Sequence, residues 1–115
     1  MMTLFILLQV KHWYVDFVLQ NQEMINNKGT YGNPYGVFHS LQHSAFTLAL
    51  LLLVVTPWFA LVLAVFDFLT HYHIDWLKSN YGNRDITNPK FWNHLGLDQM
   101  AHQIVYGIII ALVHI

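Results

Sequence analysis

The stretch "SAFTLALLLLVVTPWFALVLAVF", residues 44–66, decides how this chain folds. It is almost wholly apolar, and about 20 such residues suffice for one helix to cross a bilayer. One interpretation is therefore a single spanning helix with a kink at Pro57. The alternative is a tight turn at Thr56-Pro57, because the residue before a proline disfavours helix and proline suits the first turn of a new one. We expect the turn, which makes the two flanking helices antiparallel neighbours.

The composition is that of a protein in contact with lipid or buried in a larger assembly. The 115 residues are 56% hydrophobic and 10% charged, whereas soluble domains average about 25% charged. We therefore expect one helical membrane domain over residues 1–115, with the lipid bilayer as its main partner. The formal net charge of −1 offers no electrostatic basis for binding a nucleic-acid duplex, and the absence of Cys excludes thiolate metal sites.

Polar loop signals divide the rest of the chain into helices. The segments "NNKGTYGNPYG" and "YGNRDITNPK" are rich in Asn, Gly and Pro, which is typical of loops. Together with the turn at Thr56-Pro57 they predict an all-α fold, a four-helix up-down-up-down membrane bundle. Its helices are expected at about 3–27, 37–55, 57–80 and 91–115.

Each predicted helix carries two side chains that can bind a metal, four residues apart. This spacing puts both on one helix face with Cβ atoms about 6 Å apart, as in the helix of zinc proteases. The pairs are His12 and Asp16, His39 and His43, His71 and Asp75, and Asp98 and His102.

Because an α-helix rises about 1.5 Å per residue, the position of each pair gives its depth in the bundle. All four pairs are expected in the half of the bundle nearest the polar loops. Ionisable side chains within a membrane usually face the bundle interior and mark function, and bundle cores hold metals between facing helices. We therefore predict a His/Asp site in the core for Zn, Mn or Fe, with one ion or two. For any single pair, a hydrogen-bonded polar core is the simpler interpretation.

Four further polar side chains flank the pairs. Gln20 continues the face of His12 and Asp16, where it would orient a ligand or simply end the helix. Lys28 and Lys78 would hold a phosphate, or extend towards the interface as cations at helix ends do. Asp67 lies one turn from His71. It is either a deeper carboxylate of the site or a hydrogen-bonding residue of the bundle.

The motifs "HWYVDFVLQNQEMINNK", "HSLQH", "HYHIDWLK" and "LDQMAH" occur in this order along the chain. Together they resemble the bacterial and phage domain-of-unknown-function family 3307, a family of small polytopic membrane proteins. The resemblance implies a role for Gln99 beside the residues already named. It extends distantly to membrane-bound metal-dependent hydrolases and to zinc phospholipase C and zinc nucleases, which is an analogy of fold.

Two functions are compatible with these residues. The first is a membrane-embedded metal-dependent hydrolase of a small phosphorylated substrate, either a phospholipid or a nucleotide. The alternative is a non-enzymatic membrane protein that uses the His/Asp core to handle metal ions or protons, or that regulates a host partner. The apolar segments "LALLLLVV" and "IIIALVHI" count against a conduit, and a chain this short would need to form a homo-oligomer to act as a transporter.

Loop charges predict the orientation. Lys28, Arg84 and Lys90 lie in the polar loops, close to Lys78. The positive-inside rule then puts the metal-site end of the bundle towards the cytoplasm in the inner membrane. Lys11 is the exception to this charge pattern.

Overall fold

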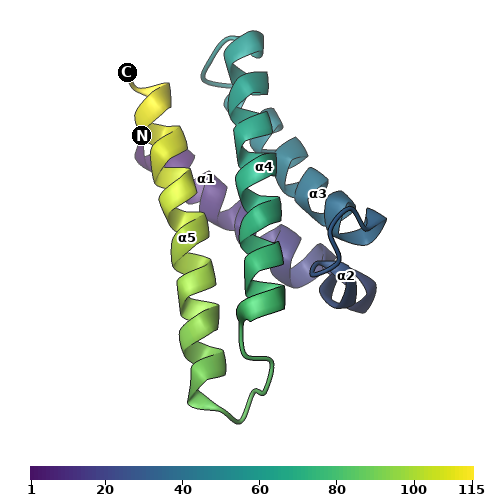
Figure 1. The fold of residues 1–115 in the computed structure, drawn as a ribbon. Coiled ribbons are helices and arrows are strands. Elements are labelled where there is room, and N and C mark those ends of the chain that lie inside the picture. The colour runs from purple at the N-terminus through teal and green to yellow at the C-terminus, as the bar shows by residue number, and fades with distance from the viewer.

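The computed structural model describes residues 1–115 and is all-α, as predicted (Figure 1). Helices α3, α4 and α5 run antiparallel to their neighbours in the chain, and α1 crosses behind them, packing on α3 and α5. Both termini lie at the same end. The elements are α1 (Met2–Trp13), the π-helical segment η1 (Tyr14–Leu19), α2 (Gln22–Asn27), α3 (Pro34–Leu51), α4 (Pro57–Tyr81) and α5 (Pro89–Val113).

The turn at Thr56-Pro57 is formed, and the single kinked helix is excluded. Helix α3 ends at Leu51, four residues earlier than predicted, and the backbone N–H groups of Val54 and Val55 donate to Leu51 O at 3.0 and 2.9 Å. Thr56 is extended, with φ −63° and ψ 150°, and Pro57 opens α4. The turn brings the His pair of α3 to the same level as the His/Asp pair of α4.

The first helix is not continuous, which corrects the predicted helix at 3–27. After η1 the backbone becomes extended at Gln20, with φ −68° and ψ 127°, and Asn21 caps α2 by accepting the N–H of Met24 at 2.9 Å. An Asn side chain favours this capping position over a helix interior. The break turns the chain back towards the bundle, so that Lys28 reaches within 3.6 Å of Asp75 Oδ2.

The loop between α4 and α5 is built from close backbone contacts. A Cβ on Gly82 would lie 2.5 Å from Lys78 O, so a larger residue would clash where α4 ends. The backbone N–H and the hydroxyl of Thr87 both donate to Asp85, which lowers the pKa of that carboxyl. Asn88 then caps α5.

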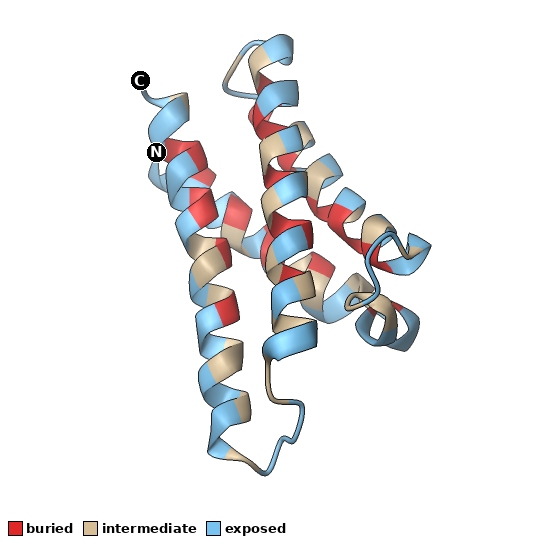
Figure 2. Cartoon of the chain, in the orientation of Figure 1, coloured by how far each residue is buried: buried red, intermediate tan, exposed pale blue.

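Apolar side chains occupy both the core near the termini and the outer faces of the helices. Exposed faces alternate with the buried positions of α3, α4 and α5 in Figure 2, and residues as large as Trp58, 75% exposed, lie on the outside. Three helical stretches are long and apolar enough to cross a membrane: Met2–Leu19, Pro57–Tyr81 and Pro89–Val113. The core cluster comprises Leu4, Leu8, Leu51, Ala60, Leu63, Val105, Tyr106, Ile109 and Ile110.

Candidate metal centre

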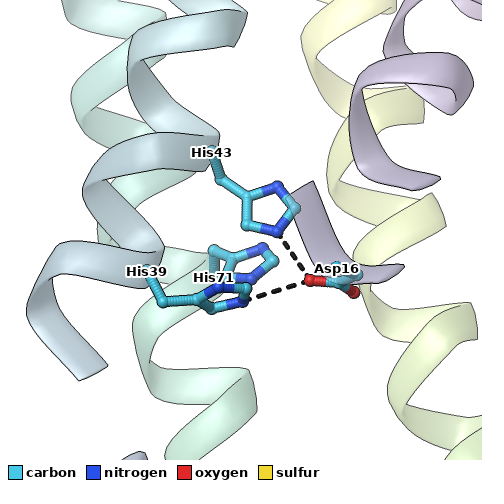
Figure 3. Close-up of side chains that lie close together, drawn as sticks. All are labelled: Asp16, His39, His43 and His71. Carbon is cyan, nitrogen blue, oxygen red and sulfur yellow. Dashed lines mark hydrogen bonds and ion pairs between the residues drawn. The ribbon is translucent and has the colours of Figure 1, made fainter. Parts of the chain in front are cut away.

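Polar side chains from four elements meet in the interior of the bundle. In Figure 3, Asp16 of η1 faces the rings of His39 and His43 of α3 and His71 of α4. Asp16 Oδ1 lies 2.7 Å from His43 Nε2 and 3.1 Å from His39 Nε2. The four residues form a first group, because each offers one ligand atom within 4.8 Å of the others.

A second group adjoins the first and shares His71. It contains His71, Asp75 and His102, again with ligand atoms within 4.8 Å of one another. Asp75 lies between the two rings, with Oδ2 3.1 Å from His71 Nε2 and Oδ1 3.2 Å from His102 Nε2. The two rings have centroids 4.1 Å apart. Six of the eight predicted ligands therefore belong to one or both groups.

The other two predicted ligands lie beside the groups. His12 Nε2 is 3.1 Å from Asp16 Oδ2, and Asp98 Oδ1 is 3.5 Å from His102 Nε2. Gln99 joins them, since its Oε1 lies 2.9 Å from His12 Nε2 and its Nε2 donates to Asp98 Oδ2 at 3.1 Å. Gln99 therefore links His12 to Asp98, while the role implied for it by the family resemblance stays a prediction.

The remaining candidates occupy the end of the site nearest the loops. Lys28 pairs with Asp75, and Lys78 Nζ lies 3.9 Å from Asp98 Oδ2. Gln20 is turned to the backbone, where its Nε2 donates to Asp16 O at 3.0 Å. Two cations therefore lie beside the carboxylates, while Gln20 holds the π-helical turn of η1.

A buried network on the other side of the cluster includes Asp67, which is a hydrogen-bonding residue of the bundle, one of the two roles expected for it. Sequence reasoning did not connect it with Lys11, Thr47 and Tyr106. Lys11 has only 4% of its surface exposed, and its Nζ lies 3.4 Å from Asp67 Oδ2 and 2.9 Å from Tyr106 OH. Thr47 donates to the same Asp67 oxygen at 2.6 Å. Lys11 is thus an internal ion-pair partner, which explains why it departs from the charge pattern of the loops.

A signal for this network was present in the helical spacing. Three of its members extend the predicted stripes by one further turn, which is the i, i+4 relation already used, whereas Lys11 directly precedes His12. Thr47 follows His43 by four residues, Asp67 precedes His71 by four, and Tyr106 follows His102 by four.

The donor atoms fit a divalent transition metal. Both ring nitrogens of His39 and of His71 are buried and form no hydrogen bond, and the same holds for Asp75 Oδ2 and Asp98 Oδ1. The two Nε2 atoms lie 3.1 Å from carboxylate oxygens of Asp16 and Asp75, so their Nδ1 atoms are the ones without a polar neighbour among these contacts. Leaving such groups unpaired costs about 1–3 kcal/mol each. Imidazole nitrogen and carboxylate oxygen are the ligands that Zn, Mn and Fe accept, so a bound ion would satisfy atoms that the protein leaves free.

Apolar helices around a buried His/Asp cluster define a helical protein with potential membrane spans and a potential metal site. The chain belongs to the family described as protein of unknown function (DUF3307), which matches residues 4–115 and confirms the resemblance. No curated protein and no solved structure matches the chain.

Proposed function

We propose that this protein is a membrane-embedded, metal-dependent hydrolase of a phosphoester. The observation that carries the proposal is the buried junction of two His/Asp groups through His71, in a bundle with three helical stretches apolar enough to cross a membrane. Ionisable groups are costly at such depth and usually serve function. When bound at these residues, a divalent ion would lower the pKa of a water molecule and polarise a phosphoryl oxygen.

The protein's own cations supply the binding of phosphate. Lys28 lies beside Asp75, and Lys78, about one-third exposed, lies beside Asp98. An ammonium group donates strong hydrogen bonds to phosphate oxygens. Lys28 is the better placed of the two to hold the substrate at the metal site, because its partner Asp75 belongs to one of the His/Asp groups, whereas Asp98 lies beside them.

A cavity of about 270 Å³ between α4 and α5 offers a path to the site. Lys78 and Asp98 line it, and Asp98 also borders the second His/Asp group. Its apolar wall includes Ile74, Leu77 and Leu97. Because it lies between two potential membrane spans, this wall favours a lipid phosphoester over a nucleotide.

The alternative role as a conduit for metal ions or protons has less support. Beyond Lys11 and Asp67, the bundle is filled by the nine-residue core cluster, whose only polar atom on a side chain is the hydroxyl of Tyr106. That hydroxyl already contacts Lys11 and His12. A conduit would need polar groups or water through this layer.

Hydrolysis is the direct test of this proposal. Protein in detergent, loaded with Zn or Mn, should cleave a fluorescent phospholipid analogue faster than a nucleotide phosphodiester. Lys28→Met should lower kcat/KM by about 100-fold or more while the metal content is retained, because a charged donor to the phosphate is lost. Lys90→Met, at an exposed lysine of the loop end, is the matched control. Failure of the metal-loaded protein to cleave either substrate would refute the hydrolase.

The orientation proposed from the loop charges can be tested because the chain has no Cys. Ile86→Cys places a thiol in the α4–α5 loop, and Leu53→Cys places one in the α3–α4 turn; these side chains are 60% and 76% exposed. In intact spheroplasts an impermeant maleimide should label Leu53→Cys only, and Ile86→Cys only after the membrane is opened. The reverse pattern would invert the orientation, and labelling of both from outside would argue against spanning.

A further inference from the structure

We infer that residues 20–33 form a lid over the His/Asp site, which opens to admit the metal ion and the substrate and closes with Lys28 at the substrate phosphate. The inference rests on the proposed function and adds the movement that controls access to its site. Such a movement is needed because His39, His71 and Asp75 are each no more than 6% exposed. The cavity between α4 and α5 reaches Asp98, but none of these three residues lines it.

The lid is the part of the cover with the fewest buried side chains. Helix α2 packs on the loop end of α3 (Figure 1), and Met24 is the only buried residue between positions 20 and 33. Each of the long helices α1, α3, α4 and α5, by contrast, contributes to the apolar core cluster. Segments that bury few apolar side chains open at a low free energy. Opening the lid therefore costs less than separating two of the long helices.

The lid is bounded by a change of backbone conformation at each end. At Gln20 the backbone leaves the π-helical turn and becomes extended, with ψ 127°. At Gly32 it adopts φ +82°, in the left-handed region that favours glycine. Hinges of moving segments are a few residues in loops or at the ends of elements, which absorb the change of φ and ψ. The two ends therefore allow α2 and the loop that follows it to move as one unit.

A small set of contacts with α4 holds the lid closed. The backbone N–H of Gly32 donates to Tyr72 OH at 2.6 Å, and the ring of Tyr31 packs edge-on against that of Tyr72, with centroids 5.3 Å apart. Asn80 Nδ2 donates to Gly29 O at 2.9 Å. Hydrogen bonds at the surface exchange for bonds to water at little net cost. The contacts are therefore sufficient to position the lid and weak enough to release it.

The closed lid brings Lys28 to the site. Its Nζ lies 3.6 Å from Asp75 Oδ2, and its backbone lies against the first turn of α3, where a Cβ on Gly36 would be 3.3 Å from Lys28 Cα. Opening the lid withdraws this ammonium group and uncovers Asp75. A phosphate bound at the site would attract the ammonium group back through charge-assisted hydrogen bonds, so the substrate favours the closed lid, as in other enzymes with mobile loops.

A disulfide can lock the lid, because the chain has no Cys and a Cβ on Gly29 would lie 3.2 Å from Ser79 Cβ. Disulfides join Cβ atoms about 3.5–4.5 Å apart, so a small shift suffices. Metal-free Gly29→Cys/Ser79→Cys would be oxidised in detergent, checked for helix content and mixed with Zn, and Zn per chain would be followed over time by mass spectrometry. The locked protein should take up Zn at least about 10-fold more slowly than wild type, because the disulfide lowers the open population.

Two controls receive the same oxidant. Wild type and Gly29→Ala, which adds the Cβ without the lock, should both take up Zn quickly. Equal uptake by the locked protein and wild type would refute the lid. Failure of the two cysteines to pair in folded protein would refute its closed position on α4.

Hydrogen exchange in metal-free protein separates this inference from the proposed function. Tyr72→Phe removes the acceptor of the Gly32 N–H, so the amides of residues 22–33 should exchange about 3- to 10-fold faster, as expected for one lost hydrogen bond. Tyr81→Phe, on the same helix and 75% exposed, is the matched control and should change nothing. A wild type that binds no Zn would sink the metal-dependent function. Unchanged exchange of residues 22–33 in Tyr72→Phe would sink the lid by itself.

Discussion

Replacing His71 by alanine should leave the purified protein without bound transition metal, whereas wild type retains about one ion per chain. His71 is 1% exposed and is the residue that both His/Asp groups share. Its ring lies between those of His43 and His102, with centroid distances of 3.8 and 4.1 Å. The loss of a residue that only orients a ligand weakens metal binding by roughly 10- to 100-fold. The loss of the ligand itself should weaken metal binding by more than this.

The chain offers a close control for this substitution. His73 lies two residues further along α4, but its Nδ1 donates to Leu69 O at 2.6 Å and it is exposed. His73→Ala should therefore keep its metal. Metal content would be measured by mass spectrometry after gel filtration, with far-UV circular dichroism to verify helix content. Retention of the ion by folded His71→Ala would refute the metal centre described above.

The second large effect concerns folding. Lys11→Met should lower the free energy of unfolding by about 3–5 kcal/mol, because removing one partner of a buried ion pair leaves the other charge uncompensated. The side chains of Lys11 and Asp67 are only 2% and 1% exposed, so water cannot replace the missing partner. Domains have only about 5–15 kcal/mol of stability, so the variant should unfold at a much lower temperature.

A double variant identifies the cause of this loss. Lys11→Met combined with Asp67→Asn removes both charges, keeps an acceptor for Thr47, and should recover a large part of the stability. Lys90→Met should change the stability by less than about 0.5 kcal/mol, since that lysine is exposed. Thermal unfolding in detergent, followed by circular dichroism, measures all three. If the double variant were as unstable as Lys11→Met, the uncompensated charge of Asp67 would not be the cause.

Local rules of the chain predicted most of the helices. The turn at Thr56-Pro57 followed from the restriction that proline places on its neighbour, and the structure has it at that position. The break after Leu19 was not predicted, although Asn21 is a good capping residue. No Gly or Pro occurs between residues 3 and 27 to mark the break. The π-helical turn depends on packing against α3, where Asp16 meets the two histidines.

By itself, the sequence determined the all-α fold, the apolar outer faces and the four pairs of ligand-type residues at a common level. These properties follow from helical periodicity and from turn-forming residues, which act over a few positions. Only the tertiary structure decided which residues meet across helices: that His71 joins two groups, and that Lys11 reaches His43, Asp67 and Tyr106. The spacing of residues in one helix determines which side chains share a face, but the crossing of α1 over α3 and α5 determines what that face contacts.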